Sequence, residues 1–199
     1  PAAEYPTNAF STKILASFSD EAEPRQVCIA GRMMSRRVMG KASFIELQDS
    51  KGRIQVYITR DDLCPDENKD IYNIVFKKLM DIGDFIGVKG FVFRTQTGEI
   101  SAHAQELTML SKSLKPLPIV KYKDGVAYDK FDDPELRYRQ RYVDLVVNDG
   151  VKDTFLQRAT VIRTIRRVLD EAGYTEVENP TLQMIAGGAS ARPFMTHFN

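Results

Sequence analysis

The chain has 199 residues, of which 43% are hydrophobic and 28% charged. This composition is that of an ordinary folded protein with one large domain or two small ones. The 28 basic and 27 acidic side chains leave a net charge of +1. This balance argues against a chain that is polycationic throughout and against an acidic tail. Any charged surface must therefore come from local asymmetry.

Cysteine, histidine and hydropathy patterns exclude several further classes. Cys28 and Cys64 stand alone, and the chain has only two histidines, so we expect no metal site and no disulfide framework. Reduced thiols are typical of the cytoplasm, where we place the protein. No apolar run approaches the roughly 20 residues of a membrane span, and the first residues lack the plan of a signal peptide. We therefore expect neither membrane insertion nor export.

Hydrophobic periodicity predicts the first domain. Residues 1–24 are polar and are expected to form an N-terminal extension. Apolar positions then alternate in three stretches and, after a helical interval, in two more, as expected for strands. The predicted strands cover residues 25–31, 44–48, 53–59, 84–95 and 99–110.

A helix is predicted between the third and fourth strands, over residues 70–83. Its apolar face is expected to contain Ile71, Ile74, Val75, Leu79 and Ile82. Three strands, one helix and two strands form the element order of a five-stranded OB-fold barrel, a mainly β fold. We assign this barrel to residues 25–112, with a different split barrel as the competing architecture.

The remainder of the chain predicts a second domain with α+β character. Residues 113–150 begin with a proline-rich linker, and a helix capped by Asp133 follows up to about residue 150. A second helix is expected over 151–172, and a short strand over 175–178. Residues 151–199 are too few to bury a substantial core, so we expect them to be the truncated start of a larger domain.

Charge and side-chain alternation point to the outer face of the barrel as a binding surface. Residues 25–60 contain eight basic and two acidic side chains, a net of +6. Burial of Ile54, Val56 and Ile58 places Gln55 outside, and burial of Ile45 and Leu47 likewise places Phe44 outside. The residues expected on this outer face are Phe44, Glu46, Gln48, Arg53, Gln55, Tyr57 and Thr59.

An outward aromatic ring among arginines and amides favours recognition of single-stranded RNA, because splayed bases stack on rings and amides bind base edges. The alternative is that Phe44 packs beneath the loop after the first strand. By position alone, Glu99 is a solvated turn carboxylate, and His103 is a structural or surface residue. Gly187 and Gly188 predict only a turn, since they lack the remainder of a phosphate-binding motif.

Three segments closely resemble class II lysyl-tRNA synthetases, in the order and spacing of that family. They are Arg32-Met-Met-Ser-Arg-Arg-Val-Met-Gly-Lys-Ala-Ser-Phe44, Tyr138-Arg-Gln-Arg-Tyr-Val-Asp-Leu145 and Gly187-Gly-Ala-Ser-Ala-Arg-Pro-Phe194. The resemblance extends from about residue 5 to the end. It implies an OB-fold domain that binds the tRNA anticodon, followed by a class II catalytic domain on an antiparallel sheet.

The resemblance also assigns site residues. It implies that Arg37, Phe44 and Gln55 hold the central anticodon uridine, with the Phe44 ring as stacking platform. Glu99 matches the glutamate at the first anticodon base, contrary to its interpretation from position alone. Gly187 matches a glycine whose backbone contacts the substrate lysine.

The implied activity of the parent enzyme is ATP-dependent attachment of lysine to its tRNA. ATP and Mg²⁺ are implied for the complete enzyme, and a homodimer is implied by residues 155–180, which resemble class II motif 1. Motifs 2 and 3 are expected beyond residue 199, so we expect this chain alone to form no lysyl-adenylate, to contain no catalytic residue and to bind no cofactor. The alternatives are a non-catalytic OB-fold module for single-stranded nucleic acid, a regulatory synthetase paralogue and a dimeric scaffold.

Overall fold

The computed structural model describes residues 4–118, 121–123, 126–128, 130–178, 180 and 196–197, with 121–123 and 126–128 described by their backbone. The chain divides into two compact units, Pro1–Phe131 and Asp132–Asn199. Each unit is described by itself below.

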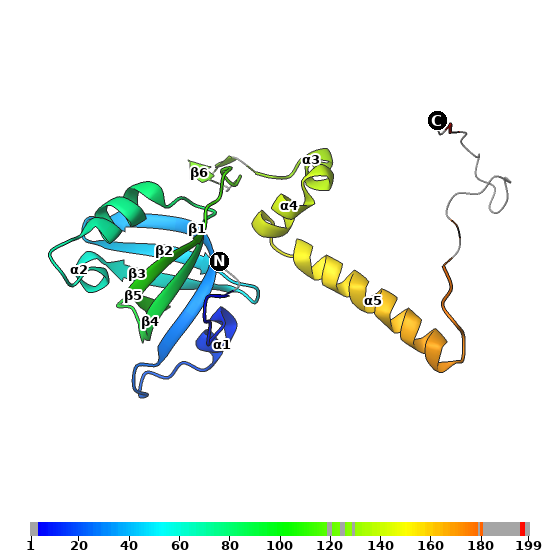
Figure 1. Ribbon diagram of the computed structural model, residues 1–199, viewed down its shortest axis with the longest axis horizontal. Coiled ribbons are helices and arrows are strands. Elements are labelled where there is room, and N and C mark those ends of the chain that lie inside the picture. Colours follow the sequence, from blue (N-terminus) through cyan, green and yellow to red (C-terminus); the bar gives the residue numbers. More distant parts are fainter. Residues whose placement is uncertain are drawn as a thin grey trace. The chain divides into compact units, whose positions relative to one another are not determined.

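Five strands of the first unit close into a barrel (Figure 1). They are β1 (Gln26–Met39), β2 (Ala42–Gln48), β3 (Arg53–Thr59), β4 (Phe85–Arg94) and β5 (Ile100–Ser111). The order around the barrel is β1-β2-β3-β5-β4, and β4 pairs with β1 to complete it. Only β3 and β5 are parallel among these neighbours. The predicted OB-fold barrel is thereby confirmed.

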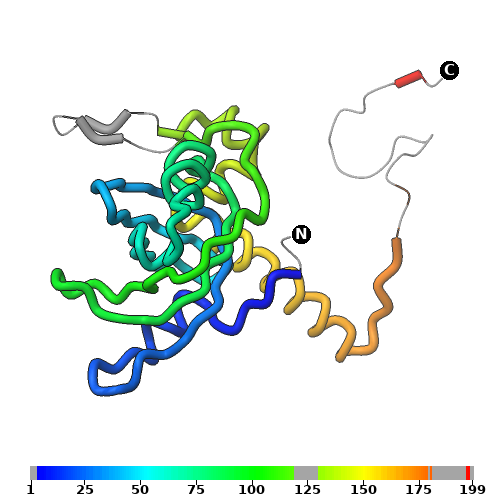
Figure 2. Tube along the Cα trace, turned by 60° about the vertical axis from the view of Figure 1, so that its left-hand side comes forward, coloured from blue at the N-terminus to red at the C-terminus, as the bar shows by residue number. Residues whose placement is uncertain are grey.

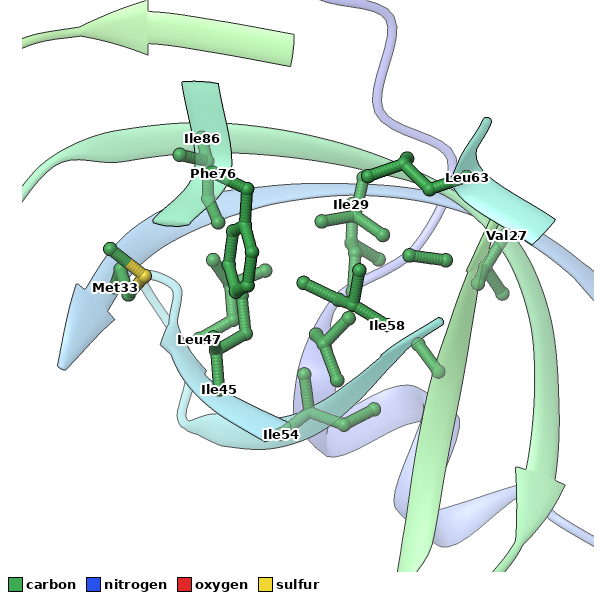
Figure 3. Packing of buried hydrophobic residues seen from close by; sticks show 14 of the residues in the cluster. Val27, Ile29, Met33, Ile45, Leu47, Ile54, Ile58, Leu63, Phe76 and Ile86 are labelled. Carbon is green, nitrogen blue, oxygen red and sulfur yellow. The ribbon is translucent and has the colours of Figure 1, made fainter. Parts of the chain in front are cut away.

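Strict alternation along β2 and β3 decides which side chains enter the core. Every second residue of both strands is buried, including Ile45 and Ile58. Figure 3 shows these side chains meeting others from β1 and β4 inside the barrel. Because neighbours along a strand point to opposite faces, Phe44 and Gln55 lie on the outer face, as predicted.

The N-terminal segment packs against the barrel (Figure 2). The backbone N–H of Asn8 donates to the Cys28 carbonyl oxygen at 3.0 Å, and its side-chain oxygen accepts from the Cys28 N–H at 2.8 Å. The short helix α1 (Ser11–Ala16) places Ile14 in the core with 1% of its surface exposed. Ser11 donates its N–H and hydroxyl to the Asp49 carboxylate, at 2.6 and 2.9 Å. This segment therefore contributes to the folded unit of the barrel.

The helix between β3 and β4 forms, but most of its predicted apolar face is not buried: of the residues expected there, Val75 packs against the core, whereas Ile71, Ile74 and Leu79 are exposed. It is a π-helix, η2 (Ile71–Leu79), and its buried side chains are Tyr72 and Phe76. Ile71, Ile74 and Leu79 are 47%, 41% and 56% exposed. The wider i→i+5 winding changes which residues share a face, and the Tyr72 hydroxyl is held inward by hydrogen bonds to Ser43 Oγ (2.8 Å) and the Gly40 carbonyl oxygen (3.2 Å).

Two smaller elements complete the first unit. The helical turn α2 (Arg60–Leu63) follows β3 directly, and the Thr59 hydroxyl accepts a hydrogen bond from the Asp62 N–H at its start. Strands β6 (Lys121–Lys123) and β7 (Val126–Tyr128) pair as an antiparallel hairpin. The sequence predicts only a polar linker at this hairpin.

Gly90 permits a close approach of β4 to β5 beside a register irregularity. A Cβ atom at this position would lie 1.8 Å from the carbonyl oxygen of His103 and 2.9 Å from its carbonyl carbon. Paired backbone cannot move aside as a flexible side chain does, so we expect Gly90→Ala to lower the free energy of unfolding by about 3 kcal/mol. Urea denaturation measures this change. Lys89→Ala, at the preceding residue of the same strand, is the control, and an equally small change in both variants would contradict the prediction.

The second unit begins with two short helices, α3 (Pro134–Arg139) and α4 (Arg141–Val147). Asp133 caps α3 as predicted, accepting from the Leu136 N–H at 2.8 Å. The single helix predicted up to about residue 150 is wrong, because the backbone leaves helical geometry at Gln140. The break allows the side chains of Arg137 and Arg141 to reach the buried Asp144 carboxylate from both sides.

Asp144 shows how the two short helices hold a buried charge. Burial by itself raises the pKa of Asp144, but hydrogen bonds from Asn148 and Arg137 hold that pKa below its ordinary value. The charged form is therefore the stable one, as expected where a buried carboxylate has several donors.

The long helix α5 (Val151–Glu171) is present as predicted. Gly150 precedes it with φ +79° and Gly173 follows it with φ +85°, in the left-handed conformation that glycine adopts without strain. The strand predicted over 175–178 does not form: these residues are described without strand pairing, and a strand requires a neighbour for its hydrogen bonds. Among the residues described, no helix has the length and apolar character to cross a membrane.

Candidate nucleic-acid interface

A pocket of about 330 Å³ opens on the outer face of the barrel. It is lined by all four residues to which the family resemblance assigns anticodon binding: Arg37, Phe44, Gln55 and Glu99. Ser35, Glu46 and Arg53 complete its polar lining. Strand pairing explains the grouping, because Arg37 lies opposite Phe44 in the β1–β2 register and Gln55 lies opposite Ser101, two residues after Glu99.

Phe44 offers a partly exposed ring in this pocket. The guanidinium carbon of Arg37 lies 5.4 Å from the ring centroid, a cation–π contact. The centroid of the Tyr57 ring lies 4.9 Å from that of Phe44, at an interplanar angle of 40°. These two contacts hold the Phe44 ring in place, and the ring remains partly exposed.

The charges around the pocket are mixed and partly paired. Arg53 donates to Gln48 Oε1 at 2.9 Å and forms an ion pair with the Glu46 carboxylate at 3.3 Å. Arg53 thereby neutralises the charge of Glu46, one of the two acidic side chains that line the pocket. Arg37 and Glu99 both line the pocket, where they offer a donor and an acceptor for base edges.

Two arginines of the cationic stretch, Arg32 and Arg36, donate to backbone carbonyl groups and so have structural roles. Arg36 donates to the carbonyl oxygens of Phe76 and Met80, at 2.8 and 2.6 Å, and so satisfies the end of η2. Arg32 donates to the Gly83 carbonyl oxygen at 2.7 Å and lies 4.1 Å over the Phe85 ring. Burial lowers the pKa of Arg32.

An aromatic row continues from Phe44 across the neighbouring strands, and no local pattern in the sequence predicts it as a unit. Tyr57 lies opposite both Phe44 on β2 and His103 on β5, and His103 lies opposite Phe91 on β4. The ring centroids of Tyr57 and His103 are 5.1 Å apart, and those of Phe91 and His103 are 4.8 Å apart. Outward positions on each strand are visible in the sequence, but their alignment depends on strand register.

His103 has a carboxylate partner that spacing along the chain does not indicate. Its Nε2 lies 2.9 Å from Asp62 Oδ2, across 41 residues of sequence. The Thr59 hydroxyl donates to the same Asp62 oxygen, and these bonds hold the pKa of Asp62 below its ordinary value despite partial burial. The interpretation of His103 as a structural residue fits this bond, which ties β5 to α2.

Gly187, which the resemblance assigns to substrate lysine, lies outside the described residues. In the region that resembles motif 1, α5 exposes large apolar side chains along its length. Those with at least 40% exposure are Leu156, Val161, Ile162, Ile165, Val168 and Leu169.

Comparisons with known proteins agree with this architecture. Residues 27–110 match the model of the OB-fold nucleic acid binding domain, and residues 133–199 match the model of class II tRNA synthetases (D, K and N). The barrel and its polar pocket thus occupy the region of the first match. These findings define the chain as an OB-fold domain joined to the start of a class II tRNA synthetase domain.

Individual relatives narrow the class. Over its full length the chain is 63% identical to a lysine–tRNA ligase of Azobacteroides pseudotrichonymphae and 64% identical to one of Porphyromonas gingivalis. It is 52% identical to a lysine–tRNA ligase of Christiangramia forsetii. The chain belongs to the lysyl-tRNA synthetase family and carries its anticodon-binding region with the start of the catalytic domain. It spans 35–40% of the length of these relatives.

Proposed function

We propose that the first unit binds the anticodon loop of lysine tRNA and distinguishes its bases through the pocket on the outer face of the barrel. The observation that carries this proposal is the gathering of Arg37, Phe44, Gln55 and Glu99 around one pocket of about 330 Å³. A splayed base stacks on Phe44, while Gln55 and Arg37 bind the edge of the central uridine. Glu99 accepts a hydrogen bond from the first anticodon base.

We further propose that the complete protein attaches lysine to this tRNA in the cytoplasm, as a homodimer that pairs through the exposed apolar side of α5. ATP and Mg²⁺ belong to the activity of such an enzyme. In the parts of the chain that the structure describes, no group of three or more His, Cys, Asp or Glu side chains is placed to hold a metal ion. We therefore assign no step through either group to these residues.

Fluorescence anisotropy with an anticodon stem-loop tests the binding proposal. We expect tighter binding of a loop with the central uridine than of one in which another base replaces it. Loss of the hydrogen bonds to the edge of one base is expected to raise Kd by about 5- to 150-fold. Titrations at two salt concentrations separate this effect from phosphate binding.

Equal affinity for both loops, together with a steep loss at higher salt, would contradict base reading. Such a result would instead identify a generic electrostatic binder of single-stranded nucleic acid. The match to a class II synthetase over residues 133–199 does not favour that alternative.

A further inference from the structure

One arginine ties the turn that carries Glu99 to the N-terminal segment. Arg94, the last residue of β4, donates from Nε to Asp20 Oδ1 at 2.8 Å and from Nη2 to Oδ2 at 2.9 Å. Its Nη1 donates to the Gly98 carbonyl oxygen at 2.9 Å. Gly98 directly precedes Glu99, so one guanidinium joins residue 20 to the backbone beside a pocket residue.

The Arg94 guanidinium also makes a cation–π contact with an aromatic ring. Its central carbon lies 5.2 Å from the ring centroid of Phe18, on the same N-terminal segment as Asp20. A planar group with a bidentate carboxylate, a carbonyl acceptor and an aromatic neighbour has a defined orientation, which an ammonium group would lack. The direction of the Arg94–Gly98 bond is therefore set by residues 18 and 20.

The turn itself is internally bonded. The Glu99 N–H donates to Thr95 Oγ1 at 3.0 Å, and the Thr95 N–H donates to the Glu99 carbonyl oxygen at 2.9 Å. The Gly98 N–H donates to the Thr95 carbonyl oxygen, also at 2.9 Å, with Gly98 at φ +91°. These bonds define the shape of the turn, whereas Arg94 connects it to a segment outside the turn.

We propose that Asp20 and Arg94 are positioning residues for Glu99, so that the N-terminal segment controls specificity at the first anticodon base. Neither residue lines the pocket, and both act by holding the turn in the place from which the Glu99 carboxylate meets the base. Hydrogen bonds weaken steeply as distance and angle depart from their optimum, so a small shift of the turn is enough to reduce discrimination. This inference rests on the proposed anticodon function.

The test uses the whole chain and three stem-loops: the lysine anticodon, the same loop with a purine as first base, and the same loop with the central uridine replaced. For each variant, anisotropy gives two ratios. The first-position ratio is the Kd of the loop with the replaced first base divided by the Kd of the lysine anticodon loop, and the central ratio is the same quantity for the loop with the replaced central uridine. We expect Arg94→Ala and Asp20→Ala to reduce the first-position ratio by about fivefold and to leave the central ratio unchanged. Arg94→Lys should also reduce the first-position ratio, because an ammonium cannot make all these contacts, whereas Asp20→Glu should retain most of it.

Two controls distinguish positioning from other roles. If Arg94 bound phosphate directly, Arg94→Ala would weaken all three loops equally and flatten the salt dependence, and Asp20→Ala would weaken none of them. Lys89→Ala breaks the 2.7 Å ion pair with Glu106 across the same two strands and should change neither ratio. In a Glu99→Gln background, Arg94→Ala should lower the first-position ratio no further.

The outcomes separate this inference from the function on which it rests. When the central preference is present, a first-position ratio that survives both Arg94→Ala and Asp20→Ala overturns the positioning role alone. A first-position ratio that is absent from the unchanged chain overturns the positioning role together with the proposed contact of Glu99, and leaves recognition of the central uridine standing. Absence of any base preference in the unchanged chain overturns both proposals. Because Asp20 and Arg94 are exposed surface residues, we expect the variants to keep the unfolding midpoint of the unchanged chain, which urea denaturation verifies.

Discussion

Replacing Phe44 with alanine will weaken binding of the anticodon stem-loop by about 1–3 kcal/mol, the contribution of one base stacked on an aromatic ring. In Kd this is about a 5- to 150-fold increase. The ring is expected to act through stacking because it is partly exposed in the pocket and carries no hydrogen-bonding group. Anisotropy titrations at constant salt measure the change.

Phe44→Tyr and Phe10→Ala are the matched comparisons for this variant. The tyrosine keeps a ring for stacking and should retain most of the affinity. Phe10 is 44% exposed and lies outside the pocket, so its removal should leave Kd unchanged. If Phe44→Ala binds as tightly as the unchanged chain, the ring does not stack on a base, and Phe44 belongs to the packing of the outer face instead.

The second large effect concerns the core beneath η2. Phe76 is fully buried and stacks on Tyr72 with ring centroids 5.5 Å apart (Figure 3 shows Phe76 among the buried side chains of the cluster). We expect Phe76→Ala to lower the free energy of unfolding by about 3–5 kcal/mol, through lost burial and the cavity left behind. Urea denaturation followed by circular dichroism gives this value.

Leu79→Ala is the control on the same helix. Leu79 is 56% exposed, so we expect a change within about 0.5 kcal/mol. The regular helical pattern predicted from the sequence requires the opposite result, with Leu79 buried. A larger loss for Leu79→Ala than for Phe76→Ala would therefore contradict the π-helical register of η2.

The contrast between β2, β3 and η2 shows where sequence reasoning succeeds. In a strand, neighbouring side chains point to opposite faces, so apolar alternation alone places Ile45, Val56 and Phe44 on their correct sides. In η2 the residues that share a face depend on how the helix is wound. Contacts of Tyr72 with Ser43 and Gly40, more than 25 residues away, take part in deciding that geometry.

The candidate site likewise has features that local sequence patterns predict and features that depend on contacts between distant residues. Alternation predicts that Phe44 and Gln55 lie outside, and the sequence also shows an excess of basic residues over 25–60. Glu99 was assigned through the family resemblance, because its local sequence is that of any polar turn. The sequence did not reveal that Arg32 and Arg36 bind backbone carbonyl groups, since those acceptors lie 40 or more residues along the chain.

Sequence patterns alone predict the order of strands and helix along the chain, the inward and outward faces of β2 and β3, and the family to which the chain belongs. Each of these depends on local periodicity or on contiguous motifs. The fold, in contrast, brings together side chains that are far apart in the sequence: Phe44 with Tyr57 and His103 along one row, Asp62 with His103, and Asp20 with Arg94. These contacts arise from the register of paired strands and from closure of the barrel. No local pattern encodes them, because they depend on the whole set of strand pairings at once.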